Sequence, residues 1–201
     1  NSLNPKKDNR MPSSEIAPLC RQANEIRKDI IRMLAEAGSG HPGGSLSMAE
    51  IVSALYFQEM KHDPQRPQWE DRDRFVLSKG HGIPAVYAAM AMTGYFPKEE
   101  LKTLRRTGAR LQGHPDRVRL PGIEASTGSL GQGLSVAQGI ALGLRLAKKD
   151  SRVFCVLGDG ESQEGQIWEA AMSIPKFKLG NLTAIVDYNK GQIDGHVKDV
   201  M

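Results

Sequence analysis

Two oxygen-bearing side chains follow two predicted strands near the end of the sequence. Gly158-Asp159-Gly160 comes directly after the apolar run 153–157, and Asn189 follows the apolar run 182–186. Both runs are predicted to be buried strands, and the segment between them has the pattern of a helix, so the three form a β-α-β unit. If the strands are neighbours, Asp159 and Asn189 meet at one edge of a parallel sheet, where such folds bind ligands.

A hard divalent cation fits this pair of side chains. Mg²⁺ takes oxygen ligands and commonly uses one or two protein groups together with substrate phosphates. Gly158 and Gly160 allow the backbone to approach a phosphate, and the helix start after them offers free amide donors. The pattern predicts a diphosphate with Mg²⁺, or with Ca²⁺ or Mn²⁺. The alternative, a turn with a capping Asp159, is disfavoured by the strand-helix-strand context.

Three histidines stand in predicted loops, each flanked by glycine or proline: His41, His81 and His114. Imidazoles exchange protons near neutral pH, so the three histidines indicate acid-base catalysis. Two alternatives stay open at this point. Each histidine could be a turn residue bonded to the backbone, or the three could form a zinc site, although the oxygen site nearby favours magnesium.

The elements that hold these loops follow from apolar periodicity and from the positions of Gly and Pro. Ser47 and Glu50 have the spacing of a capping box at the start of a second helix, and Pro175 is predicted to end the helix between the last two strands. Residues 107–133 are rich in Gly and Pro and are predicted to be a functional loop. The predicted helices are 16–37, 48–59, 84–92, 97–105, 134–149 and 164–174, and the predicted strands are 75–77, 153–157 and 182–186. Strands alternating with helices predict an α/β fold in which helices cover both faces of a parallel sheet.

Length and composition bound the class of protein. The chain has 201 residues, 39% of them apolar and 25% charged, which suits one globular domain over residues 15–201 after a flexible arm, residues 1–14. The net charge of +4 is dispersed, apart from a short basic run in the arm. Without a basic helix or an aromatic platform, nucleic-acid binding is not expected.

The two cysteines and the absence of long apolar runs bear on location. Cys20 and Cys155 are far apart and belong to no Cys-x-x-Cys pair, so a reducing compartment is expected. No apolar run reaches a membrane-spanning length, and the start has no signal-peptide pattern. The sequence predicts a cytoplasmic protein without membrane contact.

At this point the motifs carry a family resemblance. Five blocks occur in the order known from transketolases: Gly40-His41-Pro42-Gly43-Gly44, Ser78-Lys79-Gly80-His81-Gly82, Gly113-His114-Pro115, Gly128-Ser129-Leu130-Gly131-Gln132-Gly133, and Gly158-Asp159-Gly160 with Asn189. The sequence resembles this thiamine-diphosphate family over about residues 15–201. The resemblance implies the pyrophosphate-binding module of the fold. It also implies that this domain continues past the position of Met201.

The resemblance further implies roles for individual residues. Asp159 and Asn189 would bind the metal by their side chains, and Gly191 by its carbonyl. His81 and Gly160 would contact the diphosphate of thiamine diphosphate, and Gly158 would also belong to the cofactor site. Gly128 and Leu130 would line the middle of the cofactor or its aminopyrimidine end. His41 and His114 would face the sugar. Two positions depart from the family pattern without removing a ligand: Tyr188, and the stretch Glu161-Ser162.

By resemblance, the chain is the amino-terminal half of a transketolase, which transfers a two-carbon ketol unit from a ketose phosphate to an aldose phosphate. Its expected partners are a chain with the pyrimidine-binding domain, which carries the activating glutamate, and a second copy of itself in a heterotetramer. Alternatives are a related enzyme (dihydroxyacetone synthase or deoxyxylulose-phosphate-synthase-like) or a non-catalytic cofactor-binding module. A nicotinamide site at 128–133 is disfavoured by the spacing of its glycines.

Overall fold

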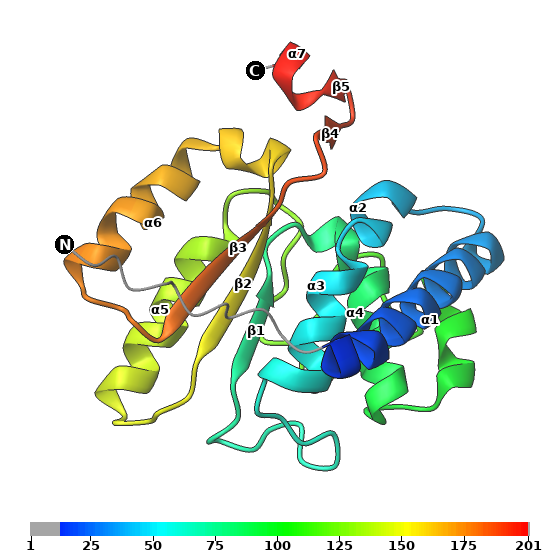
Figure 1. Ribbon diagram of the computed structural model, residues 1–201, viewed down its shortest axis with the longest axis horizontal. Helices are drawn as coiled ribbons and strands as arrows, with labels where there is room; N and C mark the ends of the chain where they lie inside the picture. The colour runs from blue at the N-terminus through cyan, green and yellow to red at the C-terminus, as the bar shows by residue number, and fades with distance from the viewer. Residues whose placement is uncertain (1–12, 201) are drawn as a thin grey trace.

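The computed structural model describes residues 13–200, and it has a parallel three-stranded sheet at its centre (Figure 1). The strands are β1 (Arg74–Leu77), β2 (Val153–Gly158) and β3 (Leu182–Asp187), in the order β1-β2-β3. Leu77 pairs with Val156, and Gly158 pairs with Asp187, so the carboxyl ends of all three strands lie at one edge. The last two strands, β2 and β3, are neighbours, which is the condition under which Asp159 and Asn189 were expected to meet at one edge.

Helices cover both faces of the sheet. On one side lie α5 (Gly133–Leu146) and α6 (Gly165–Lys176), and on the other lie α1 (Ser13–Ala37), α3 (Ala49–Ala54) and α4 (Ile83–Thr93) (Figure 1). Strand β2 alternates between the two cores: Phe154 and Val156 pack with α1, α3 and α4, whereas Cys155 and Leu157 pack with α5 and α6. The predicted α/β architecture is therefore confirmed.

Helices α1 and α4 contribute many of the buried residues in the core that contains Phe154 and Val156. In α1, Ile26, Ile30 and Met33 recur at helical spacing and are almost fully buried. Gly38 ends α1 with a φ of 64°, a left-handed conformation that favours glycine. In α4, every residue from Ile83 to Ala91 is buried, because the helix packs against α1 and α3 within this core.

Short elements complete the described chain. They are α2 (Pro42–Leu46), the π-helix η1 (Leu55–Glu59), the 3-10 helices η2 (Gly80–Gly82), η3 (Lys98–Thr103) and η4 (Gly160–Gln163), the hairpin strands β4 (Gly191–Gln192) and β5 (Gly195–His196), and α7 (Val197–Val200). The hairpin and α7 project beyond the sheet in Figure 1. No helix or strand occurs over residues 104–132, which agrees with the predicted loop.

The capping box predicted at Ser47 and Glu50 is wrong. The residue before α3 is Met48, and no side chain caps the helix. The Ser47 hydroxyl donates instead to Asp187, and Glu50 accepts from Arg27 on α1. Tertiary partners have displaced the local capping bonds. The single helix predicted over 48–59 consists of two parts in the structure, the α-helix α3 and then the π-helix η1.

The helix end predicted at Pro175 is wrong, whereas a helix does begin next to Pro97 as predicted, although of another type. Helix α6 does not stop before Pro175 but includes it and continues to Lys176. A proline lacks the N–H that would bond within the helix, but the N–H of Phe177, two residues later, still reaches the carbonyl of Ser173 at 3.0 Å. The helix predicted to open at Pro97 is the 3-10 helix η3, shorter than expected.

Strand β3 is not buried as its apolar run predicted. Within residues 13–200 it pairs with β2 alone, and Thr183, Ala184 and Val186 are exposed. An apolar run is buried only where another element covers its face, and in the described chain part of this face is uncovered. Asp187, the last residue of the strand, is buried by the contacts of the site itself.

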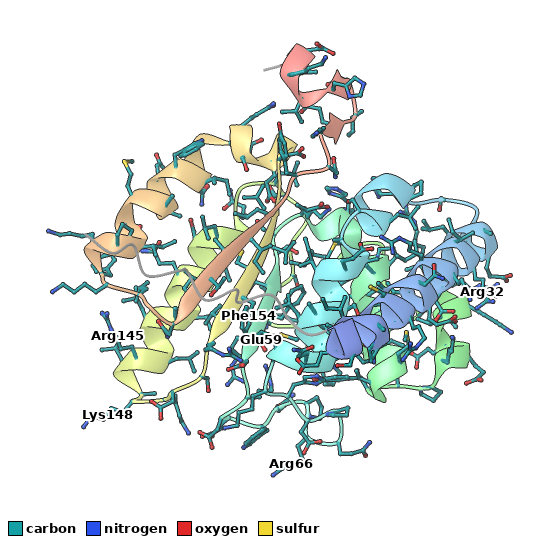
Figure 2. All side chains as sticks on the ribbon, in the orientation of Figure 1. Arg32, Glu59, Arg66, Arg145, Lys148 and Phe154 are labelled. Atoms are coloured by element: carbon teal, nitrogen blue, oxygen red, sulfur yellow. The ribbon has the colours of Figure 1, made fainter. Side chains whose placement is uncertain are left out.

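Charged side chains are spread over the surface. Figure 2 shows Arg32, Arg66, Arg145 and Lys148 at separate places, on α1, on the loop before β1 and near the end of α5, whereas Phe154 lies inside against the sheet. No helix within residues 13–200 combines the length and apolar character needed to cross a membrane. Of the predicted arm, only Ser13 and Ser14 belong to the described residues, as the first two of α1; the rest lies outside them.

Candidate functional site

A single cavity of about 570 Å³ lies at the carboxyl edge of the sheet. Its lining includes every residue that the sequence singled out for the site: His41, His81, His114, Gly128, Leu130, Gly158, Asp159, Gly160, Asn189 and Gly191. These residues come from six separate segments of the chain. The fold therefore brings together what the sequence motifs could only suggest.

Asp159 is placed by the end of β2 and by the loop after β3. Its Oδ1 accepts from the backbone N–H of Gly160 at 2.9 Å, and its Oδ2 accepts from that of Lys190 at 2.5 Å. The side chain is buried, with the residue 7% exposed, yet no cationic side chain of the described chain pairs with it. A buried carboxylate without a counter-ion is costly, so this position favours a bound cation.

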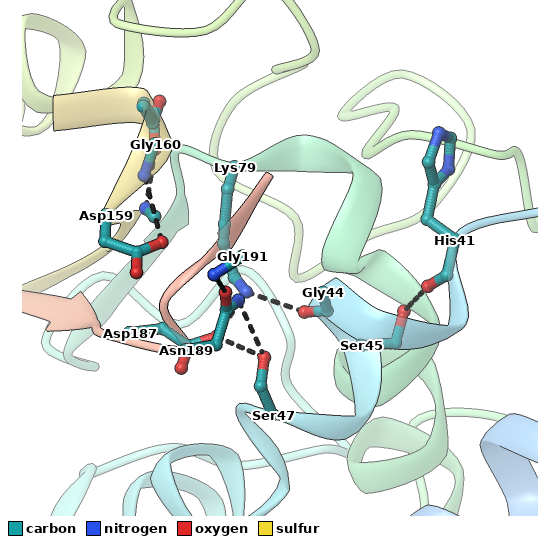
Figure 3. Close-up of polar contacts among 12 residues, drawn as sticks. His41, Gly44, Ser45, Ser47, Lys79, Asp159, Gly160, Asp187, Asn189 and Gly191 are labelled. Atoms are coloured by element: carbon teal, nitrogen blue, oxygen red, sulfur yellow. Dashed lines mark hydrogen bonds and ion pairs between the residues drawn. The ribbon is translucent and has the colours of Figure 1, made fainter. Parts of the chain in front are cut away.

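Asn189 faces the same cavity from the loop after β3 (Figure 3). Its Oδ1 accepts from the N–H of Gly191 at 2.9 Å, and its Nδ2 donates to the hydroxyl of Ser47 at 3.3 Å. The carboxylate of Asp159, the amide oxygen of Asn189 and the carbonyl of Gly191 are all hard oxygen donors. They have the chemistry that a magnesium-type ion prefers.

The three histidines lie close together. The ring centroids of His41 and His81 are 5.4 Å apart, and those of His41 and His114 are 6.0 Å apart. Burial, followed by the charges of Lys79, His41 and His114, lowers the pKa of His81 to about 4. Burial, and then His41 and Arg105, also lower the pKa of His114. His81 is therefore neutral at physiological pH.

The zinc alternative fails on geometry. Within residues 13–200, no three His, Cys, Asp or Glu side chains are arranged so that they could hold a metal ion. The three imidazoles are near neighbours but not a ligand set. An oxygen site that depends on one carboxylate, one amide and a carbonyl is compatible with this finding, because it needs no such cluster.

A buried ion pair that the sequence did not indicate lies beside the cavity, whose lining includes one of its members, Lys79. The Nζ of Lys79 donates to Oδ2 of Asp187 at 2.5 Å and to the carbonyl of Gly44 at 2.6 Å (Figure 3). The Lys79 side chain passes over Gly158, where a Cβ would lie 3.5 Å from its Cδ. The position of Lys79 two residues before His81, inside a conspicuous motif, was the available signal.

Glu161 is the second feature that sequence reasoning missed, having noted it only as a departure from the family pattern. It is 3% exposed and ties three segments together. Its Oε1 accepts from the hydroxyl of Ser78 at 2.5 Å and from the N–H of Gly131 at 2.9 Å, and its Oε2 accepts from the N–H of Gly158 at 3.0 Å. Its carboxylate thereby fixes two of the glycine-rich segments around the cavity.

Two glycines allow these segments to meet. A Cβ at Gly80 would lie 2.7 Å from the carbonyl oxygen of Thr127, and a Cβ at Gly133 would lie 2.5 Å from Ser78. Both contacts are too short for any other residue. The glycines at these positions are thus required by close packing of the loop 78–82 against the loop 127–133.

The fold and the cavity define a class: a parallel α/β protein with a cleft beyond the strand ends, whose lining includes carboxylate, amide and imidazole groups that suit an anionic ligand and a cation. The sequence matches the family described as "Transketolase, thiamine diphosphate binding domain" over residues 20–201. The chain belongs to this family, and it is similar to the amino-terminal part of transketolases.

Individual relatives agree with this assignment. The chain is 51% identical to a 6-deoxy-6-sulfo-D-fructose transketolase subunit of Clostridium sp. (strain MSTE9), covering 94% of this chain and 68% of the relative. It is 42% identical to an apulose-4-phosphate transketolase subunit of Phocaeicola vulgatus, covering 93% of this chain and 66% of the relative. Among solved structures, transketolase from Leishmania mexicana matches with a TM-score of 0.88 at 36% identity, over 96% of this chain and 30% of that chain.

The residues present fit the family's cofactor. Gln192 is among the residues that line the cavity, and its buried Nε2 has no hydrogen-bond partner in the described chain, so the protein itself leaves this donor unsatisfied. Asp159 offers an unpaired negative charge to a cation. Gly160 faces the cavity without a side chain, and a Cβ there would meet Gln192 at 3.1 Å. The donors, the charge and the open backbone all match a metal-bound diphosphate.

Proposed function

We propose that this chain is the cofactor-binding half of a transketolase that transfers a two-carbon ketol unit from a ketose to an aldose phosphate, with thiamine diphosphate and a divalent metal. The observation that carries the proposal is the convergence of ten predicted site residues on one cavity. Membership of the family and the names of the relatives support it.

In this proposal the chain's own residues grip the cofactor. Asp159, Asn189 and Gly191 hold the metal, preferably Mg²⁺, through three oxygens. The neutral His81 and the backbone of Gly160 contact the diphosphate. Gly158 and Lys79 also line the cavity, and we assign the backbone of Gly158 to the same cofactor. Gly128 and Leu130 line the middle of the cofactor. When bound, thiamine diphosphate supplies the nucleophilic carbon that amino-acid side chains lack.

His41 and His114 handle protons at the sugar. Both line the cavity and lie at its rim, where they are more exposed than His81. A histidine with a lowered pKa is neutral near pH 7 and can accept a proton from a hydroxyl, as His114 would do here. We assign these two residues to proton transfer at the substrate hydroxyls, and His81 to the diphosphate end.

Two kinds of partner complete the proposal. The Clostridium and Phocaeicola relatives are named as subunits, and the chain spans only part of their length, so we expect further protein to contribute to the active site. The exposed face of β3 and the exposed Trp168 and Met172 on α6 offer apolar surface for it. The expected partners are a chain with the pyrimidine-binding domain and a second copy of this one, which together would form a heterotetramer.

The names of the relatives bear on which sugar serves as the ketol donor. The Clostridium relative is named for 6-deoxy-6-sulfo-D-fructose, and its identity to this chain is higher than that of the relatives named for apulose 4-phosphate. This difference favours a sulfonated ketose as a second candidate donor beside a ketose phosphate. Both end in an anionic group, so the same cavity serves either donor near its reacting carbons.

The test is a ketol-transfer assay with Mg²⁺ and thiamine diphosphate, run on the chain with and without the co-expressed partner. Donors are a ketose phosphate, 6-deoxy-6-sulfo-D-fructose and apulose 4-phosphate, each with an aldose phosphate acceptor. We expect turnover only with the partner. Robust turnover by this chain alone would contradict the need for a partner. Cofactor binding without turnover on any donor would favour a non-catalytic module.

A further inference from the structure

The hydroxyl of Ser47 occupies a central place beside the proposed metal site, between α2 and α3. It donates to Oδ2 of Asp187 at 2.5 Å and accepts from Nδ2 of Asn189 at 3.3 Å (Figure 3). Ser47 and Asn189 are far apart in the sequence, so the fold alone creates this contact. None of the sequence motifs pointed to it.

The hydrogen-bond pattern fixes which end of the Asn189 amide faces which way. A serine hydroxyl has one proton, and Ser47 gives it to a carboxylate that can only accept. The remaining lone pairs of Ser47 must therefore receive a donor, which is the NH₂ end of Asn189. At the other end, Oδ1 of Asn189 accepts from the N–H of Gly191 at 2.9 Å.

The flipped amide would fail at both ends. Its oxygen would face the Ser47 oxygen, whose only proton is already used, and its NH₂ group would face the N–H of Gly191. At one end two acceptors, the amide oxygen and the Ser47 oxygen, would face each other, and at the other end two donors, the NH₂ group and the N–H of Gly191. The network thus keeps Oδ1 on the side of Gly191, whose carbonyl is the neighbouring proposed metal ligand.

Asp187 is itself held in place. Lys79, 1% exposed, donates to the same Oδ2 that accepts from Ser47, and it also bonds the carbonyl of Gly44 on α2. The ammonium group neutralises the buried carboxylate and fixes its position. A continuous chain of contacts therefore runs from Lys79 through Asp187 and Ser47 to Asn189.

We propose that Ser47, oriented by Asp187, is a positioning residue that sets the Asn189 amide so that its oxygen faces the metal. The inference rests on the proposed function, in which Asn189 is a metal ligand. Partners that orient a metal ligand commonly change metal affinity by about 10–100-fold when they are removed. A merely structural role for Ser47 predicts lower stability with unchanged metal affinity.

The test compares Ser47→Ala and Ser47→Thr with a matched control, Ser53→Ala. Ser53 lies on the adjacent helix α3, is buried, and donates to the carbonyl of Leu19 at 2.8 Å, away from the cavity. In the full-length protein with its partner, Mn²⁺ affinity is measured by electron paramagnetic resonance at saturating thiamine diphosphate. Thermal unfolding is recorded on the metal-free proteins.

We expect Ser47→Ala to weaken Mn²⁺ binding by about 10–100-fold, and Ser47→Thr to restore most of it because the hydroxyl returns. Ser53→Ala should lower the unfolding temperature while leaving Mn²⁺ affinity unchanged. Wild-type Mn²⁺ affinity in Ser47→Ala would overturn the proposal.

A second readout separates this proposal from the proposed function. The side-chain NH₂ resonances of Asn189, observed by NMR in the metal-free protein, should show slowed exchange in the wild type and lose it in Ser47→Ala. If the wild type binds neither metal nor cofactor, the proposed function fails. Equal exchange of the Asn189 amide in both proteins would by itself refute the positioning role.

Discussion

Lys79 and Asp187 form a buried ion pair that joins the ends of the two outer strands. The distance from Nζ to Oδ2 is 2.5 Å, and the two side chains are 1% and 7% exposed. Lys79 follows β1 shortly after its end, and Asp187 ends β3, so the pair spans the end of the central strand β2. This ion pair therefore holds the ends of β1 and β3 together at the edge of the sheet where the site lies.

Removing one partner of this pair should destabilise the protein strongly. Lys79→Met leaves the Asp187 carboxylate buried without its cation, and we expect a loss of about 3–5 kcal/mol in the free energy of unfolding by urea. The double variant Lys79→Met/Asp187→Leu should recover much of this loss, because no unpaired charge remains. A single variant within about 1 kcal/mol of the wild type would show that the pair is unimportant for stability.

The metal assignment predicts a selective loss of cofactor binding. Asp159→Asn removes the buried, unpaired carboxylate of the cavity, and Asn189→Ala removes the amide oxygen. Each variant should lose Mg²⁺-dependent binding of thiamine diphosphate in titration calorimetry, because a metal site loses much of its affinity when one of its hard oxygen ligands is removed. Circular dichroism should show both variants folded. Retention of wild-type affinity in both would rule out the metal site.

Glu161→Gln tests the carboxylate that ties the glycine-rich loops together. An amide in its place turns an NH₂ donor toward one of three existing donors, so we expect a loss of about 1–3 kcal/mol in stability and weaker cofactor binding. Glu99→Gln is the control, because Glu99 is exposed and has no partner in the described chain. An unchanged unfolding midpoint in Glu161→Gln would argue against the anchoring role.

His114→Ala should lower turnover far more than cofactor affinity. General acid-base groups contribute about 10²- to 10⁴-fold to rate, and His114 lies at the exposed rim rather than at the diphosphate end. The assembled enzyme is assayed for kcat, and calorimetry gives the Kd of thiamine diphosphate. Normal kcat with a lowered melting temperature would instead identify His114 as a structural residue of its loop.

His81 should remain neutral at pH 6. Its pKa is lowered to about 4 from an ordinary 6.5, so the unfolded chain binds the proton first as the pH falls. Its contribution to stability is present above pH 6.5 and is lost as the pH falls from 6.5 to 4. Imidazole ¹⁵N shifts measure the pKa directly, and His81→Gln should flatten the fall in stability over this range. Titration of His81 near 6.5 would contradict the prediction.

The sequence predicted the elements whose signals are local. The stripe of Ile26, Ile30 and Met33 and the Gly38 stop define α1, and the apolar run 153–157 defines β2. The convergence of the candidate site residues on one cavity was also predictable, because their glycine-flanked motifs are conspicuous and parallel strands end at one edge. Their chemical roles remain proposals, which the variants above test.

What could not be predicted depends on contacts between distant residues. Ser47 has the local pattern of a helix cap, yet its hydroxyl bonds Asp187 because the fold brings a carboxylate within reach. Glu161 is an unremarkable acidic residue until three loops surround it. The exposure of β3 likewise depends on which elements cover it, and no property of the run 182–186 specifies them.

The register of the sheet also has a consequence for the order of folding. Strand β1 pairs Arg74 with Val153 of β2, so α4, the His114 loop and α5 all lie between the two paired strands in the sequence. Helices form from local contacts and early, whereas parallel pairing across so long a segment is slow. The cavity exists only once this pairing closes. Cofactor binding during refolding should therefore lag behind the appearance of helical structure, and thiamine diphosphate should stabilise the finished domain without accelerating its first steps.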